Sequence, residues 1–263
     1  MNSDCELESV LVIIPVRDEE TTIARVIQEL QTIGFTQIRV VDNGSRDRTA
    51  VIARTLGAEV CWEPHPGYGR ACWRGLEKCP TSIEWILFCD GDGSDDLAQI
   101  PQFLNARDEF DFILGNRCAT QAGRDAMTPV QRFGNALATR LIDWGWGVAY
   151  QDLGPLRLIR RSALEHINMR DRGFGWTVEM QVRAVECHLR ILEIPVRYRR
   201  RQGGQSKISG TVLGSVRAGT IILSTLGYLF ARRLIQPGGL IGQPSKQRSL
   251  SKGSNQSSNQ SPK

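Results

Sequence analysis

Residues 85–96 read WILFCDGDGSDD, an apolar run that ends in a dense acidic turn. The apolar half is short and continuous, which is typical of a strand buried on both faces of a sheet. Side chains alternate along a strand, so Asp90 and Asp92 should leave its end pointing the same way. Two such carboxylates repel each other unless a cation lies between them, and oxygen ligands favour Mg²⁺ or Mn²⁺. Gly91 and Gly93 would let a phosphate-bearing ligand approach the backbone, whereas the alternative interpretation is an ordinary solvated turn.

Two earlier apolar runs, VLVIIP at residues 10–15 and IRVV at residues 38–41, each end in polar residues. Helical spacing follows each run, and residues 58–62 are expected to form a third strand. Strands and helices that alternate at these lengths predict right-handed crossovers and a parallel sheet. Ligands of such sheets bind beyond the carboxyl ends of the strands. Glu19, Asp42 and the acidic turn all follow strand ends, so we expect them to share one site.

A glycine-rich turn at residues 67–72 should open a helix, and a helix start of this kind suits a phosphate group. The GxG pattern is weak evidence by itself, because no P-loop lysine accompanies it. A loop over residues 118–128 should be mobile, since it is rich in Gly, Arg, Met and Thr. Further strands are expected near residues 110–117, 156–159 and 190–198, and further helices near 131–145 and 178–187.

The composition limits the kind of protein. The formal net charge is +5, but four basic residues and no acidic ones lie beyond residue 235, which leaves about +1 for the rest. This argues against a general nucleic-acid binder. The seven cysteines form no C-x-x-C pair and no zinc spacing, so a reducing cytoplasm is expected. The polar N-terminus does not resemble a signal peptide.

The C-terminal third contains one more long helix, expected over residues 211–235. Its apolar stretch at 218–231 is shorter than the ~20 residues that span a bilayer, and arginines bracket it. The helix is therefore either a packing helix or an amphipathic helix at a membrane interface. Residues 236–263 are polar and expected to be disordered, which leaves residues 1–210 as the catalytic domain.

Four motifs, taken in order, resemble those of family 2 glycosyltransferases. They are IPVRDEE at 14–20, VDNGSRDRT at 41–49, DGD at 90–92 and RQGGQSK at 201–207. No single motif is specific, but the ordered set covers roughly residues 8 to 235. It is most similar to the dolichyl-phosphate mannosyltransferase-like branch, which implies a GT-A fold: a mostly parallel α/β sheet flanked by helices. It also implies a nucleotide-diphosphate sugar donor, Mg²⁺ or Mn²⁺ as cofactor and a polyprenyl phosphate acceptor.

The resemblance also assigns roles to individual residues. It implies donor binding by Pro15, Arg17, Glu19, Asp42, Gly69, Arg70, Asp90, Arg201 and Ser206. Asp90 and Asp92 would hold the metal, with Asp92 counted as catalytic, and Lys207 would stabilise the departing diphosphate. The sequence departs from the family at Ser94, where mannosyltransferases commonly carry a glutamine that ligates the metal. It also lacks the pairs of transmembrane helices that many relatives carry.

The acceptor decides whether the reaction needs a base. An alcohol needs one, for which Asp152 and Glu179 are the candidates, whereas a lipid phosphate is already an anion. Asp152 is also suited to forming a turn, but we favour acceptor binding for it. Glu179 is equally suited to pairing with a helix dipole. A nucleotidyltransferase and a catalytically silent sugar-nucleotide or membrane-binding module remain as alternatives. We expect a cytoplasmic protein, with peripheral contact to the cytoplasmic face of a membrane if the acceptor is a lipid.

Overall fold

The computed structural model describes residues 7–199, 212–235 and 248–249. Within these residues, eight strands form one sheet in the order β3-β2-β1-β4-β6-β5-β7-β8. The strands are β1 (Val10–Val16), β2 (Ile38–Asp42), β3 (Glu59–Trp62), β4 (Trp85–Phe88), β5 (Phe112–Asn116), β6 (Arg157–Arg160), β7 (Ile191–Pro195) and β8 (Arg248–Ser249). The α-helices are α2 (Ile23–Ile33), α3 (Thr49–Thr55), α4 (Tyr68–Leu76), α5 (Ile100–Asn105), α6 (Gln121–Ala126), α7 (Pro129–Trp146), α8 (Arg161–Ile167), α9 (Trp176–Glu186) and α10 (Val212–Ile235).

The sheet is mostly parallel, as predicted. β3, β2, β1 and β4 pair in parallel, and β7 pairs in parallel with β5. β6 is the exception, because it lies between β4 and β5 and runs antiparallel to both. As a result, the carboxyl ends of five strands, β1, β2, β4, β5 and β7, lie next to the start of β6. We call this row of strand ends the carboxyl edge of the sheet.

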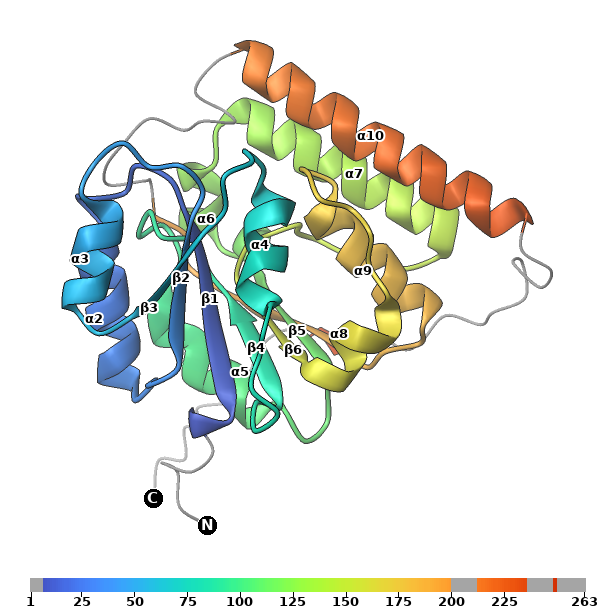
Figure 1. The fold of residues 1–263 in the computed structure, drawn as a ribbon. Helices are drawn as coiled ribbons and strands as arrows, with labels where there is room; N and C mark the ends of the chain where they lie inside the picture. Colours follow the sequence, from blue (N-terminus) through green and yellow to red (C-terminus); the bar gives the residue numbers. More distant parts are fainter. Residues whose placement is uncertain (1–6, 200–211, 236–247, 250–263) are drawn as a thin grey trace, which may run out of the picture.

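Helices lie over both faces of the sheet (Figure 1), and a hydrophobic core fills the space on each face. In β1 the alternation is clear: Val12 and Ile14 face the core formed with α2, α3 and α5, whereas Leu11 and Ile13 face the opposite core. That second core is built with α4, α7, α8, α9 and α10. A strand buried on both sides explains why the sequence of β1 is uniformly apolar.

Helix α10 packs on α7 and α9, and the three helices lie side by side in Figure 1. Leu226 and Leu229 are buried, and the ring of Phe230 stacks on Trp144 at 5.2 Å and meets Trp146 edge-on at 6.0 Å. The predicted helix is therefore confirmed, and one of its sides packs on the rest of the molecule. Among the described residues, no helix combines the length and apolarity needed to cross a membrane.

The segment predicted to be a mobile loop, residues 118–128, is instead partly helical. A 3₁₀ turn (Arg117–Ala119) leads into α6, where the Thr120 hydroxyl accepts a hydrogen bond from the Gly123 N–H. Thr128 then caps α7 through a capping box with Gln131. Two threonine caps thus organise a stretch whose composition suggested a loop. Of the predicted tail only residues 248–249 are described, and the predicted boundary at residue 210 also lies outside the described residues.

Candidate active site

A pocket of about 560 Å³ opens at this edge of the sheet, beside the ends of β1 and β4. Of the residues predicted to bind the donor or the metal, those that line it are Pro15, Arg17, Glu19, Arg70, Asp90 and Asp92. The structure thus brings together side chains from three widely separated motifs. They meet because the strands that precede them are neighbours in the sheet.

The acidic turn after β4 is held in place by its own side chains. The Asp92 carboxylate accepts hydrogen bonds from the Ser94 backbone N–H at 2.9 Å and from the Ser94 hydroxyl at 2.5 Å. The Asp95 carboxylate accepts one from the Asp90 N–H at 2.9 Å, and burial raises the pKa of Asp95 to about 7. These contacts hold the backbone that carries the Asp90 and Asp92 carboxylates.

The glycines of this turn allow neighbouring side chains to pack closely against its backbone. A Cβ atom at Gly91 would lie 2.5 Å from the Val16 side chain, and one at Gly93 would lie 2.7 Å from the Arg25 guanidinium. Gly93 also has a φ of 71°, a conformation that favours glycine. The space that the sequence interpretation reserved for a ligand is therefore occupied by β1 and α2, although the Gly91 backbone still lines the pocket.

The chemistry of the carboxylates fits a divalent cation. Asp90 and Asp92 present oxygen donors to the pocket, which are the ligands that Mg²⁺ and Mn²⁺ favour. Ser94 is engaged with Asp92 and does not take the place of the family's glutamine. Across the described part of the chain, no group of three or more His, Cys, Asp or Glu side chains is arranged to hold a metal.

The predicted base-binding residue Asp42 is nearly buried and lies at the end of β2. Its Oδ1 atom accepts a hydrogen bond from the Ser45 N–H at 2.8 Å, which shapes the turn after the strand. The next residue, Asn43, lines the pocket, and its side-chain oxygen accepts from the Gly67 N–H at 2.8 Å. Contact between Asp42 and a nucleobase stays a prediction, and Asn43 is a pocket residue that the sequence interpretation missed.

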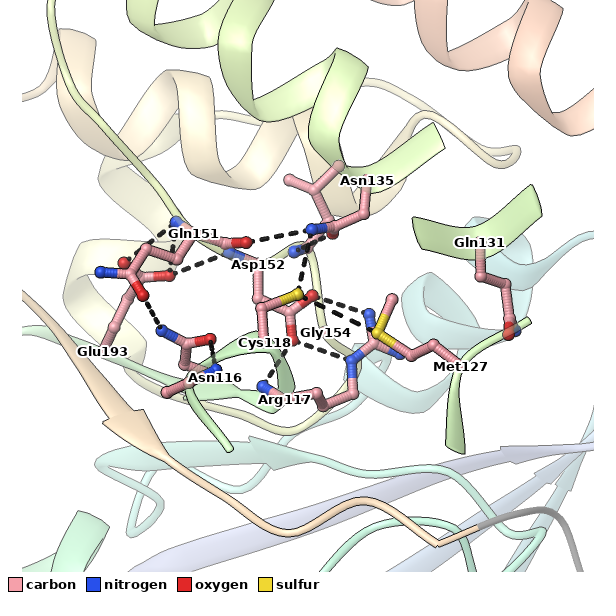
Figure 2. Close-up of polar contacts among 12 residues, drawn as sticks. Asn116, Arg117, Cys118, Met127, Gln131, Asn135, Gln151, Asp152, Gly154 and Glu193 are labelled. Carbon is pink, nitrogen blue, oxygen red and sulfur yellow. Dashed lines mark hydrogen bonds and ion pairs between the residues drawn. The ribbon is translucent and has the colours of Figure 1, made fainter. Parts of the chain in front are cut away.

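Asp152 lies at the same sheet edge but outside the pocket, in the buried polar cluster that Figure 2 shows. Its carboxylate accepts hydrogen bonds from the Arg117 backbone N–H (2.7 Å) and from Nε and Nη2 of the Arg117 guanidinium (both 2.8 Å). This pairing raises the pKa of Arg117 despite its burial. Nearby, Glu193 accepts from the N–H groups of Gln151 and Asp152, and burial raises the pKa of Glu193 to about 7.

Glu179 is also buried outside the pocket. Its carboxylate accepts hydrogen bonds from the backbone N–H groups of Arg170, at 3.0 Å, and Asp171, at 2.6 Å. Both predicted bases therefore accept hydrogen bonds from the chain's own donors. The predicted donor residue Gly69 is buried and does not line the pocket, although its neighbours Tyr68 and Arg70 do. Burial raises the pKa of Tyr68 well above its ordinary value, so its phenol is neutral.

The predicted phosphate-gripping residues Arg201, Ser206 and Lys207 lie outside the described residues. The two residues that precede this segment, Tyr198 and Arg199, are among the described residues, however. The Arg199 N–H donates to the Ser94 carbonyl at 2.9 Å, and Tyr198 forms an antiparallel bridge with Asp95. This cationic segment therefore starts directly beside the acidic turn.

The fold is that of the GT-A glycosyltransferases. The chain belongs to glycosyl transferase family 2, whose family model matches residues 11–167. This membership decides against a nucleotidyltransferase.

Two relatives and one solved structure illustrate the similarity. An uncharacterized glycosyltransferase of Mycobacterium tuberculosis is 33% identical over 80% of this chain and 94% of its own length. The dolichyl-phosphate hexose transferase of Haloferax volcanii is 28% identical over 74% of this chain and 85% of its own, which supports the dolichyl-phosphate mannosyltransferase-like branch. The solved glucosyl-3-phosphoglycerate synthase of Mycobacterium tuberculosis, complexed with Mn²⁺, UDP and glucosyl-3-phosphoglycerate, shares the fold. Its TM-score is 0.66 at 19% identity, over 88% of this chain and 82% of that chain.

Proposed function

We propose that the protein transfers a sugar from a nucleoside diphosphate to a polyprenyl phosphate, as a peripheral enzyme at the cytoplasmic face of a membrane. The observation that carries this proposal is the outward side of α10. From residue 220 onward its exposed positions hold no charged side chain; they are Thr220, Leu223, Ser224, Gly227, Tyr228, Ala231, Leu234 and Ile235. A solvent-facing helix normally carries charges on that side.

Helix α7 adds an exposed aromatic side chain next to α10. Trp144 is 77% exposed and stacks on Phe230 of α10, and Phe133 of α7 is 70% exposed as well. Exposed aromatic and aliphatic side chains gathered on two adjacent helices are typical of a surface that contacts a membrane or another protein. Ile221 of α10 also lines the pocket, so the same helix carries the apolar surface and contributes to the site.

A phosphate acceptor agrees with the positions of the two candidate bases. Asp152 and Glu179, the two candidates, are both buried and engaged with donors of the chain. A phosphate oxygen attacks the anomeric carbon as an anion and needs no proton acceptor. We therefore assign Asp152 and Glu179 to positioning. The relative named for dolichyl-phosphate hexose transfer supports the same class of acceptor.

On the donor side, we propose that Asp90 and Asp92 hold Mg²⁺ or Mn²⁺ against the diphosphate. The cation, when bound, would neutralise the charge that develops on the departing nucleoside diphosphate. Pro15, Arg17, Glu19 and Asp42 would shape the nucleotide side of the pocket, with Gly69 and Arg70 near the sugar. Arg201, Ser206 and Lys207 would add hydrogen bonds and positive charge to the leaving diphosphate.

A soluble acceptor is the second candidate, because the fold also serves the synthase that was solved with glucosyl-3-phosphoglycerate. The test is to incubate the full chain with radiolabelled nucleotide sugars, Mn²⁺ and vesicles that contain undecaprenyl phosphate. A parallel reaction offers 3-phosphoglycerate without vesicles. Label that enters the organic phase supports the proposal, whereas label found only in water-soluble product rejects the lipid acceptor.

A further inference from the structure

The loop between α8 and α9, residues 168–175, contributes a wall of the pocket that the sequence motifs did not indicate. Arg172, Gly173 and Phe174 all line the pocket. They lie about 80 residues beyond the acidic turn in sequence, and no family 2 motif singled out above includes them. Their place therefore depends on how the loop is held.

Two helices hold the loop from both sides. Glu179 of α9 accepts the Arg170 and Asp171 backbone N–H groups, as described above. Trp73 of α4 donates its indole N–H to the Asp171 carbonyl at 3.0 Å, and the Asp171 side chain accepts from the Gly173 N–H at 2.6 Å. The backbone that carries Arg172 is thus fixed before any ligand binds.

Glycines let the loop rest directly on its neighbours. The Gly69 N–H donates to the Gly173 carbonyl at 3.1 Å, and a Cβ atom at Gly69 would lie 2.8 Å from the Arg172 backbone. A Cβ atom at Gly175 would lie 2.3 Å from the Thr225 hydroxyl of α10. The loop therefore packs between the first turn of α4 and helix α10.

The loop backbone and the Trp73 ring together position the Arg172 side chain. Its guanidinium carbon lies 4.4 Å from the centre of the Trp73 ring, a cation–π contact that restricts the side chain. Within the described part of the chain, neither Arg172 nor Arg70 takes part in an ion pair with a carboxylate. Both line the pocket, and both lie against Gly67, whose added Cβ would be 3.1 Å from the Arg172 carbonyl and 3.4 Å from the Arg70 side chain.

Arg70 and Arg172 line one pocket, and neither forms an ion pair with a carboxylate among the described residues. Guanidinium groups of this kind match a phosphate oxyanion in charge and hydrogen-bonding capacity. We propose that Arg172, together with Arg70, binds a phosphate group of a substrate in this pocket. The inference rests on the proposed function for the identity of that phosphate, which is either the donor's diphosphate or the acceptor's phosphate.

The experiment measures binding rather than turnover. Isothermal titration calorimetry compares wild type, Arg172→Gln and Arg172→Lys, with Arg170→Gln as a matched control. Arg170 loses the same charge two residues away, and its side chain does not line the pocket. The probes are UDP and GDP with Mn²⁺, and farnesyl phosphate beside farnesol, which has the same chain without the phosphate.

We expect Arg172→Gln to weaken binding of at least one phosphate probe by about tenfold or more, a loss typical of a charged hydrogen bond. Farnesol binding and the Arg170→Gln variant should stay at wild-type level, and Arg172→Lys should retain part of the affinity. A loss confined to farnesyl phosphate assigns the acceptor phosphate, and one confined to the nucleotides assigns the donor diphosphate.

The proposal is overturned if Arg172→Gln binds every phosphate probe as tightly as wild type, or if Arg170→Gln loses as much. Circular dichroism melting of each variant guards against misfolding, which an exposed arginine should not cause. If the wild type binds UDP or GDP but not farnesyl phosphate, the lipid acceptor fails. The nucleotide arm still decides the role of Arg172 in that case.

Discussion

Asp152 and Arg117 form an ion pair that is almost completely removed from solvent, with side-chain exposures of 0% and 11%. Charges buried in this way are stable only as a pair, because each alone would lose its hydration without compensation. The pair joins the turn after β5 to the segment before β6, and the Arg117 guanidinium also lies 4.9 Å from the Tyr198 ring. It therefore ties together three segments that border the active-site edge.

Replacing Asp152 by Asn should destabilise the fold, because it leaves the Arg117 guanidinium buried without a counter-charge. We expect the free energy of unfolding to fall by about 3 kcal/mol in urea titrations. Glu165→Gln is the matched control, since it breaks the exposed pair with Arg161 and should cost less than about 0.5 kcal/mol. Equal effects of the two substitutions would contradict the structural role given to Asp152.

Replacing Asp92 by Asn should abolish transfer while leaving the melting temperature close to that of wild type. Asn has the same shape and keeps an oxygen that can accept from Ser94, but it lacks the negative charge that a cation requires. Initial rates with a nucleotide sugar, measured with Mn²⁺ and with a chelator, check this. Near wild-type activity of the variant in chelator would rule out a metal held by Asp92.

The motif residues of the site could be predicted from the sequence because each follows an apolar run that ends in charge. Asp90 and Asp92 are the clearest case, since both follow directly on the buried strand that ends at Phe88 and both line the pocket. Arg172 could not be found this way, because an arginine in a loop has no periodic signal. Its position depends on Glu179 and Trp73, and only tertiary contacts bring these residues together.

One side of helix α10 is buried against the molecule and the other is exposed, and this determines how the role of the helix can be tested. Deleting it would expose the α7 and α9 surfaces that Leu226 and Leu229 now cover, so loss of function after truncation would be ambiguous. Substitutions on the outward side avoid this, because Leu223 and Tyr228 are exposed.

The double substitution Leu223→Glu and Tyr228→Glu should therefore weaken co-sedimentation with anionic liposomes at least severalfold without lowering the melting temperature. Carboxylates on this surface oppose both apolar insertion and attraction to anionic lipid. Leu229→Ala serves as the opposite control: it should lower the free energy of unfolding by about 2–5 kcal/mol. If the doubly charged variant sediments with liposomes like wild type, the outward side of α10 does not contact lipid.

Most helices and strands follow the predicted pattern within a few residues, because burial on one or two faces leaves a periodic signal. The position of β6 in the sheet could not be predicted in the same way. Its sequence indicates a strand, but its antiparallel direction and its place between β4 and β5 depend on the path of α7 and the Asp152 turn. Local patterns contain no information on strand order.

Stability of the whole molecule should depend on pH through Glu193. Burial raises the pKa of Glu193 from 4.5 to about 7, so the folded state binds a proton that the unfolded state releases between these values. The contribution of Glu193 to the free energy of unfolding is therefore fully present below pH 4.5 and is lost as the pH rises through 7. Asp95, whose pKa is also raised to about 7, acts in the same direction.

Urea unfolding at pH 5 and pH 7.5 should therefore show a loss of stability toward the higher pH. The Glu193→Gln variant should show a smaller loss, by about 2 kcal/mol. Its amide oxygen can still accept from the Gln151 and Asp152 N–H groups, so the variant should fold. Identical pH profiles for variant and wild type would show that Glu193 does not titrate in this range.

The insertion of β6 also has a consequence for synthesis on the ribosome. β1 to β4 find all their mutual partners within the first 90 or so residues, but β5 pairs only with β6 and β7, which are made later. At 5–20 residues per second, about 40 residues and several seconds separate β5 from β6. During that interval the apolar strand Phe112–Asn116 has no partner in the sheet. An unpaired apolar strand of this kind favours aggregation until β6 has been made.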